Sequence, residues 1–211
     1  MDKRKLVVEF IGTFFLVFTV GMAVIAPGAE AFAPLAIASM LTVMVYAGGH
    51  ISGAHYNPAV TFSLLLRGLV SKSEAIGYWI VQITAAVIAA LIVGMMKPEM
   101  PTEVMNGSLE IIPVFLAEFL FTFALVYVIH NVATAKATEG NSFYGFAIGF
   151  TVLAGALTVG GISGGGFNPA VYIGGSIMKI FGWSYFWLYF LAQFTAAAAA
   201  AFLFEYLQTG E

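Results

Sequence analysis

The sequence has no cysteine, only three histidines and few charges of either sign. Without cysteine it can form no disulfide framework, no thiolate metal site and no cysteine nucleophile. We therefore expect neither a metal nor a cofactor. The 8 basic and 11 acidic side chains leave a net charge of -3, which offers no basic surface for nucleic acid and excludes nucleic-acid binding.

Apolar residues, in contrast, are abundant. Hydrophobic side chains make up 61% of the 211 residues and charged side chains only 9%, whereas soluble domains carry roughly 25% charged residues. So few charges cannot cover a protein of this size with a hydrated surface. Although Lys3–Lys5 precedes a long apolar run, no signal-type cleavage site followed by a soluble domain is present. The composition therefore predicts an integral membrane protein with the lipid bilayer as its partner.

Six apolar runs are close to the length of a transmembrane helix, since a bilayer core about 30 Å thick needs about 20 helical residues. Between the second and third runs, and again between the fifth and sixth, a shorter apolar stretch of about ten residues could cross only half of the bilayer. We therefore predict an all-α fold of six transmembrane helices plus two re-entrant half-helices. The six runs lie at about Leu6–Ala26, Pro34–Gly49, Ala75–Met96, Pro113–Val132, Phe143–Gly160 and Ser184–Leu207.

The basic residues predict the orientation of the chain in the membrane. If the N-terminus is cytoplasmic, six of the eight basic residues are cytoplasmic and only Lys97 and Lys179 are external. This distribution satisfies the positive-inside rule. We expect a multi-pass protein of the cell (plasma) membrane with both termini in the cytoplasm. The six internal positions are Lys3, Arg4, Lys5, Arg67, Lys72 and Lys136.

The chain contains an internal duplication. Ile51–Val60 recurs as Ile162–Val171, 111 positions later, and Glu9-Phe10 recurs as Glu118-Phe119, 109 positions later. The spacing of the first pair, 111 positions, also relates Gln82–Ala86 to Gln193–Ala197.

Each half of the duplicated chain holds three full spans, which is an odd number. The second half must therefore enter the membrane from the opposite side, and a two-fold axis in the membrane plane relates the repeats. We predict a single channel domain, residues 1–211, made of inverted repeats at about 1–105 and 106–211.

The two half-helices are predicted to begin at mid-membrane. Asparagine is a preferred helix N-cap and proline a preferred first helical residue, and the sequence has Asn57-Pro58-Ala59 and Asn168-Pro169-Ala170. The preceding segments, Ile51–Ala54 and Ile162–Gly166, are rich in glycine and predicted to be non-helical, which is tolerated only beside a water-filled cavity or inside protein. Two helix N-termini that meet at the midplane repel cations and protons. The pattern indicates a channel filter built from backbone dipoles.

These residues resemble the aquaporin, or major intrinsic protein, family, and the resemblance covers essentially the whole chain. The doubled Asn-Pro-Ala motif and the two-fold repeat carry it. The resemblance implies a homotetramer with one pore in each subunit, and passive permeation of water or small uncharged solutes. It implies no enzymatic activity.

The resemblance also implies roles for individual residues. Glu9 and Glu118 resemble the paired carboxylates that hold the re-entrant loops. His50 and His55 are candidates for the inner vestibule or, alternatively, for packing. The residues that resemble the family's ladder of carbonyl acceptors are Gly53, Ala54, His55, Gly164, Gly165 and Gly166.

The sequence departs from the family pattern at the outer filter. The family usually has an arginine directly after the second Asn-Pro-Ala, but this chain has Val171. The loss of arginine predicts a wider, less polar filter that could pass larger neutral solutes such as glycerol. Tyr172 in place of an aspartate and the aromatic pair Phe186-Trp187 favour water instead. These features conflict, and both water and larger neutral solutes remain alternatives. By family spacing, the four filter positions are Ile37, Ala156, Gly165 and Val171.

Two other classes of protein share parts of this pattern. Gly161–Gly164 resembles the nucleophile loop of an intramembrane serine protease, with His50 or His55 as a base, but Ser52 is the repeat partner of Ser163 and indicates a structural role. A secondary transporter with broken helices would also have inverted repeats. It would need a coupling-ion site, and saturation or proton coupling of transport would distinguish it from a channel.

Overall fold

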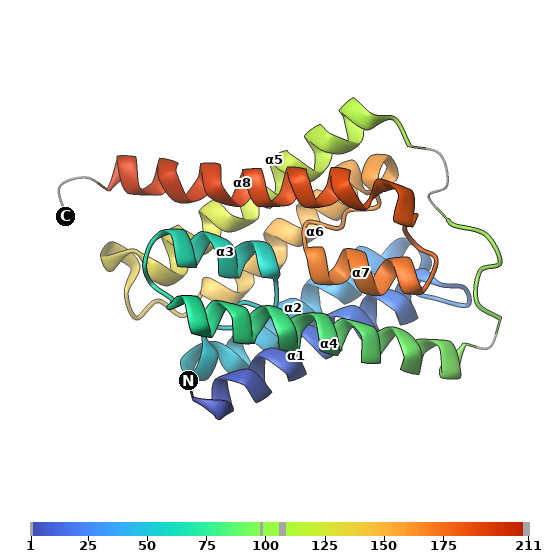
Figure 1. The fold of residues 1–211 in the computed structure, drawn as a ribbon, viewed down its shortest axis with the longest axis horizontal. Helices are drawn as coiled ribbons and strands as arrows, with labels where there is room; N and C mark the ends of the chain where they lie inside the picture. The colour runs from blue at the N-terminus through green and yellow to red at the C-terminus, as the bar shows by residue number, and fades with distance from the viewer. Residues whose placement is uncertain (1, 98, 106–108, 209–211) are drawn as a thin grey trace.

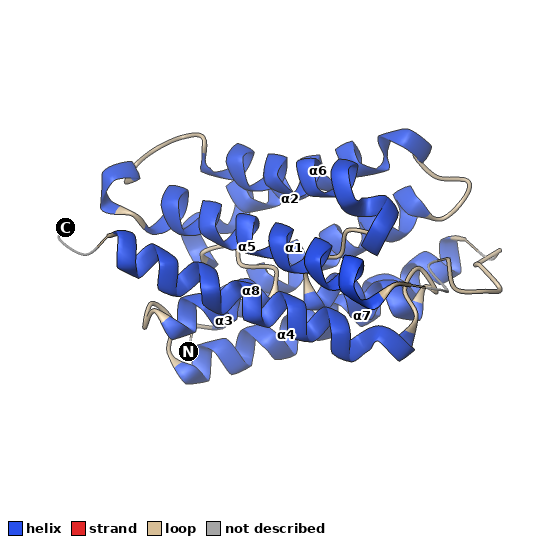
Figure 2. Cartoon of the chain, turned by 90° about the horizontal axis from the view of Figure 1, so that it is seen from above, coloured by secondary structure: helices blue, strands red, loops and turns tan. Residues whose placement is uncertain are grey.

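The computed structural model describes residues 2–97, 99–105 and 109–208, and this part of the chain is helical with no strand (Figure 2). Six long helices are each long and apolar enough to cross a bilayer. Two further helices have nine residues each. This confirms the predicted fold. The long helices are α1 (Lys3–Val24), α2 (Ala33–Ser52), α4 (Lys72–Met96), α5 (Ile111–Ile129), α6 (Tyr144–Ser163) and α8 (Phe186–Leu207), and the half-helices are α3 (Pro58–Leu66) and α7 (Pro169–Ile177).

Four short helical turns complete the described chain. Three are 3₁₀ turns in the connections between helices, and one is a π-helical turn that continues α5. They are η1 (Glu30–Phe32), η2 (His130–Thr134), η3 (Lys136–Thr138) and η4 (Trp183–Tyr185).

The second and fifth spans end three residues later than the sequence predicted. Helix α2 reaches Ser52 and α6 reaches Ser163, so the prediction that residues 51–52 and 162–163 are non-helical was wrong. Gly53 and Gly164 adopt left-handed conformations, with φ of 85° and 82°, at the helix ends. A glycine that accepts positive φ is the usual end of a helix, and the glycines that precede it do not break the hydrogen-bond ladder.

The two halves of the chain have the same packing. In the first half α1 packs against α2 and α4, and in the second half α5 packs against α6 and α8. The halves also interlock, because α3 contacts α8 and α7 contacts α4. Figure 1 shows α3 and α7 in line between α4 and α8, with both chain termini at one end of the bundle. The predicted boundary between the repeats adjoins residues 106–108, which lie outside the described residues.

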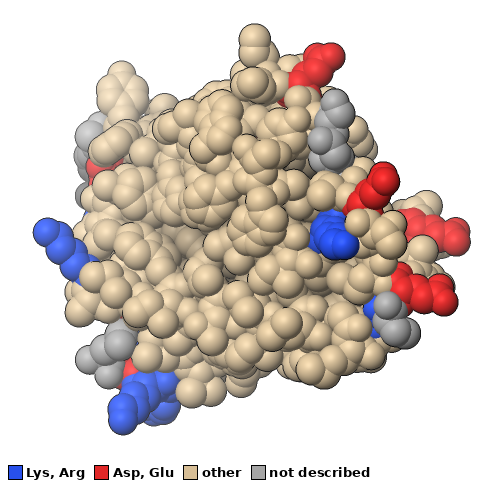
Figure 3. All heavy atoms as spheres, turned by 45° about the vertical axis from the view of Figure 1, so that its right-hand side comes forward, with Lys and Arg blue, Asp and Glu red and all other residues tan. Residues whose placement is uncertain are grey.

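The surface of the bundle suits a lipid environment. Large apolar side chains such as Ile80, Leu120 and Phe202 are exposed on different long helices. Figure 3 shows charged side chains in two groups, on the left and on the right of the displayed face, with a band of uncharged atoms between them. A wide uncharged band between two charged ends is the surface expected of a multi-pass membrane protein.

Small residues let the first re-entrant loop pack closely against α1 and α2. A Cβ atom added to Gly12 would overlap the ring of Tyr56. The Tyr56 hydroxyl donates a hydrogen bond of 3.0 Å to the carbonyl of Met44, and its ring is almost completely buried. The ring therefore cannot move away without breaking this hydrogen bond.

We expect Gly12→Ala to lower the free energy of unfolding by about 1–3 kcal/mol through overpacking. The measurement is the thermal melting temperature of the detergent-solubilised protein. Gly94→Ala is the matched control, since Gly94 lies in α4 and an added Cβ would have no heavy atom within 4 Å beyond the adjacent residues and backbone of its own helix. Equal melting temperatures for the two variants would contradict the close packing of the Tyr56 ring against Gly12.

Candidate functional site

Each half-helix begins at an asparagine that caps it. The Asn57 side-chain oxygen accepts a hydrogen bond of 2.9 Å from the backbone N–H of Ala59. Asn168 accepts the equivalent bond, also 2.9 Å, from Ala170. Both asparagines have extended backbones, and the proline that follows each is the first helical residue. The caps satisfy backbone donors that would otherwise be unpaired at the helix starts.

The same two asparagines join the halves of the protein. The Asn57 side-chain amide donates a hydrogen bond of 2.9 Å to the carbonyl of Phe167, and the Asn168 amide donates one of 2.9 Å to the carbonyl of Tyr56. The N-termini of α3 and α7 therefore meet at the centre of the bundle. Each amide group carries a second N–H that this contact does not use.

Glu9 lies behind the first re-entrant loop and is fully buried. One carboxylate oxygen accepts hydrogen bonds from the Ser52 hydroxyl at 2.7 Å and the His55 N–H at 2.9 Å. The other accepts from the Tyr56 N–H at 2.8 Å and the Gln82 amide at 2.9 Å. Four donors thus fill the four lone-pair sites of one carboxylate.

Glu118 has the matching position in the second half and is also fully buried. Its oxygens accept hydrogen bonds from the Ser163 hydroxyl at 2.7 Å and the Gly166 N–H at 2.9 Å. They also accept from the Phe167 N–H at 2.7 Å and the Gln193 amide at 2.8 Å. Because Ser163 is buried and bonded to a carboxylate, it is not positioned as a protease nucleophile.

The loops between the long helices and the half-helices have unusual backbones. Three of the four residues in each of the segments 53–56 and 164–167 have positive φ, including the non-glycine residues Ala54, Tyr56 and Phe167. Such conformations cost non-glycine residues about 1–3 kcal/mol each and need support from their surroundings. The hydrogen bonds from the N–H groups of Tyr56 and Phe167 to the carboxylates provide that support.

The carbonyl groups of the two loops differ from the loop N–H groups in their hydrogen bonding. Within the described part of the chain, no donor bonds to the carbonyl oxygens of residues 53–55 or 164–166. Backbone carbonyls at membrane depth need a polar partner. Water or a solute that passes along these loops would supply it.

The loops line a cavity of about 280 Å³. All four predicted filter residues, Ile37, Ala156, Gly165 and Val171, belong to its lining, together with Asn57 and Asn168. Its described lining contains no Asp, Glu, Lys or Arg. Most of the remaining wall is apolar, and includes Leu16, Val20, Leu41, Val152, Ile180 and Phe181.

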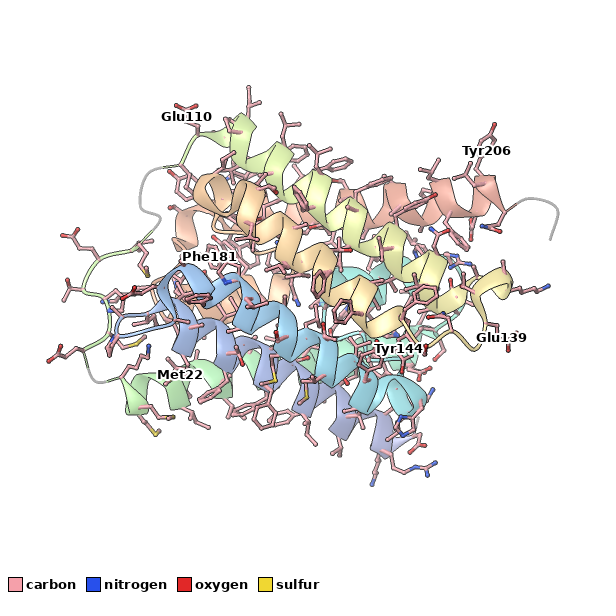
Figure 4. The ribbon with its side chains drawn as sticks, turned by 180° about the vertical axis from the view of Figure 1, so that it is seen from behind. Met22, Glu110, Glu139, Tyr144, Phe181 and Tyr206 are labelled. Atoms are coloured by element: carbon pink, nitrogen blue, oxygen red, sulfur yellow. The ribbon has the colours of Figure 1, made fainter. Side chains whose placement is uncertain are left out.

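A second cavity of about 560 Å³ lies nearer the end of the bundle that holds the termini. It is lined by His50 and Gly53, and also by Glu139 and Tyr144. Figure 4 shows Glu139 and Tyr144 at one end of the bundle and Phe181 at the opposite end. The two cavities are neighbours, because five residues line both: Val45, Ala54, Val60, Ile129 and Ile148. They lie one after the other along the bundle.

His55 lies in the first re-entrant loop and has different surroundings from His50. The His55 ring shares a hydrogen bond of 3.0 Å with the Thr61 hydroxyl and packs edge-on against Tyr78, with ring centroids 4.8 Å apart. The ring therefore packs within the protein, whereas His50 is exposed in the last turn of α2.

Sequence reasoning assigned no role to several residues that hold the loops. The hydroxyls of Tyr78 and Tyr189 donate hydrogen bonds to the carbonyls of Ser52 and Ser163, where α2 and α6 end. Tyr189 lies 111 positions after Tyr78, as Gln193 does after Gln82. Extension of the repeat that begins at Gln82 and Gln193 by four residues toward the N-terminus would have found the two tyrosines.

Two basic residues also have structural roles that the sequence did not reveal. The Lys97 amine donates hydrogen bonds to the carbonyls of Met22, Ile25 and Pro27, and so caps the C-terminus of α1. Burial lowers the pKa of Lys97. Arg67 donates hydrogen bonds to His130 and to Thr134 of the π-helical turn.

Comparisons with known proteins agree with this geometry. A family profile described as Major intrinsic protein matches residues 1–204. The chain is 35% identical to Aquaporin NIP1-4 of Oryza sativa subsp. japonica, over 99% of this chain and 78% of that protein. It is also 35% identical to Glycerol uptake facilitator protein-like 6 of Lactiplantibacillus plantarum, over 94% of this chain and 95% of that protein.

A solved structure has the same fold. The aquaglyceroporin from Plasmodium falciparum superposes with a TM-score of 0.81 at 20% sequence identity. The match covers 98% of this chain and 97% of the other. At this level of identity, the likeness supports the arrangement of helices.

Proposed function

Because this chain belongs to the major intrinsic protein family of channels for water and small solutes, we propose that it passes small uncharged solutes in addition to water. The two neighbouring cavities are the proposed path. Transport is passive, since a path of this kind needs no coupling ion. One relative carries the name of a glycerol uptake facilitator, which supports a solute of glycerol-like chemistry.

The composition of the cavity wall is the observation that carries this proposal. At the four filter positions every side chain is aliphatic or absent, and Val171 is part of the lining. No side chain there donates a hydrogen bond or carries charge. A neutral solute can bond to the loop carbonyls on one side and place its C–H groups against the apolar wall.

Asn57 and Asn168 are proposed as the polar centre of the path. Each offers one amide N–H beyond the bond that joins the two halves, and the N-termini of α3 and α7 add partial positive charge, equivalent to about half a unit for each helix. Cations and protons are disfavoured there. An ion would also have to leave water for a lining without compensating charge.

The remaining residues of the site have supporting roles in this proposal. Glu9 and Glu118 hold the two loops, and Pro58-Ala59 and Pro169-Ala170 form the first turns of the half-helices. The proposed assembly is a homotetramer in the cell membrane, with the termini on the cytoplasmic side. The distribution of basic residues supports this orientation.

The test is light scattering on proteoliposomes after an osmotic step. Water flow and the uptake of glycerol are measured separately, with protein-free liposomes as the control. We expect both rates to exceed the control and the glycerol rate to increase linearly with concentration. Fast water flow without glycerol uptake would contradict the wide filter, and saturable, gradient-driven uptake would favour a transporter.

A further inference from the structure

The chain reverses direction directly after α7 and returns to the cavity. The N–H of Ile180 bonds to the carbonyl of Gly175 at 2.8 Å, and the N–H of Lys179 bonds to the carbonyl of Ser176 at 3.2 Å. Lys179 has a left-handed backbone with φ of 60°. This pattern is a Schellman motif, in which the residue after the left-handed one folds back toward the helix. It places Ile180 and Phe181 in the cavity lining.

The ring of Phe181 is held firmly by its neighbours. It stacks on Tyr172 with ring centroids 5.2 Å apart, and it meets Tyr189 edge-on at 5.5 Å. Gly175 leaves the space for the ring, because an added Cβ would lie 2.5 Å from the Phe181 Cδ2 atom. Tyr172 is fixed in turn by a hydrogen bond from its hydroxyl to the carbonyl of Gly182. Only 2% of Phe181 is exposed.

Phe181 also differs from the other aromatic residues of the cavity. His55, Tyr56 and Phe167 belong to the re-entrant loops, and the ring of Phe167 packs against Phe121 with centroids 5.5 Å apart. Phe181 comes from outside those loops, at the end of the bundle opposite the termini (Figure 4). It lines the same cavity as Val171 and is therefore placed to supply the bulk that the filter positions lack.

We propose that Phe181 is a specificity-determining residue, which limits the width of the solutes that the channel accepts. This inference depends on the proposed channel function. The ring offers a rigid apolar face, while the polar groups of the cavity are mainly backbone carbonyls. The favoured class is thus a narrow, uncharged solute with C–H groups on one side and hydroxyl or amine hydrogens on the other.

The test compares water, glycerol and the bulkier polyol xylitol in proteoliposomes. For Phe181→Ala we expect the ratio of xylitol to water permeability to increase about tenfold, the scale on which a change in an apolar pocket alters discrimination. Phe181→Leu should give a smaller increase. Phe190→Ala is the control, because Phe190 packs near Tyr172 but does not line the cavity; its ratio should stay at the wild-type value.

A second variant tests the position of the ring without removing it. Gly175→Ala is expected to push Phe181 toward the cavity and to lower glycerol permeability more than water permeability. If Phe181→Ala does not fold, Phe181→Leu and Gly175→Ala decide the question. Unchanged permeability ratios in folded variants would overturn the role of Phe181 but not the proposed channel function. A wild-type protein with no permeability above empty liposomes would overturn the proposed function itself.

Discussion

Glu118→Leu is expected to abolish permeation and to reduce the yield of folded protein severely. Leucine leaves four buried donors without an acceptor: Ser163, Gly166, Phe167 and Gln193. Each unsatisfied donor costs about 1–3 kcal/mol, and the sum is comparable to a typical total stability of about 5–15 kcal/mol. The measurements are the monodisperse fraction in size-exclusion chromatography and the water permeability of proteoliposomes.

Two further variants separate charge from shape. Glu118→Gln keeps the shape but turns an amide NH₂ group toward donors, so we expect intermediate yield and weak permeation. Glu110→Gln is the control, since Glu110 is exposed and its side chain makes no capping bond to α5. Wild-type permeation by Glu118→Leu would show that the second loop does not depend on this carboxylate.

Val171→Arg is expected to reduce glycerol permeability at least about tenfold while water permeability falls much less. Val171 lies in the first turn of α7 and lines the cavity with Ile37 and Ala156. A longer, charged side chain there narrows the path and adds hydrogen-bond donors. An apolar or bulky solute loses more from this change than water does, and a tenfold change corresponds to about 1.4 kcal/mol. The ratio of glycerol to water permeability is the quantity to measure.

Val171→Leu distinguishes volume from charge at the same position. Leucine adds bulk without donors, so we expect a small decrease in glycerol permeability and little change for water. If Val171→Arg leaves the solute profile unchanged, this position does not control the path, and selectivity must reside elsewhere along the cavity.

The architecture could be predicted because it depends on features that are local or repeated in the sequence. Apolar runs of sufficient length gave the six spans, and Asn57-Pro58 and Asn168-Pro169 mark the starts of α3 and α7. The ends of α2 and α6 were predicted too early, since a run of glycines was interpreted as a break. The helix ends only where a glycine adopts positive φ, and composition alone does not reveal which glycine does so.

Residues that occur in one half alone could not be found in the same way. The repeat spacing that pairs Tyr78 with Tyr189 pairs Lys97 with Gln208, and Phe181 with Val70. These single-copy residues depend on contacts between distant segments. Lys97 is recognisable only when α4 ends beside α1, and Phe181 only when the chain folds back after α7.

The hydrogen bonds from Asn57 to Phe167 and from Asn168 to Tyr56 have a consequence for the history and biosynthesis of the chain. Each copy of the repeat completes the backbone of the other, and each half-helix packs against the last long helix of the opposite copy. During synthesis, the re-entrant loop of the first half therefore lacks its hydrogen bond from Asn168 until the second half has been inserted. Substitutions in one copy act on the other, so the two copies must evolve together as interdependent parts.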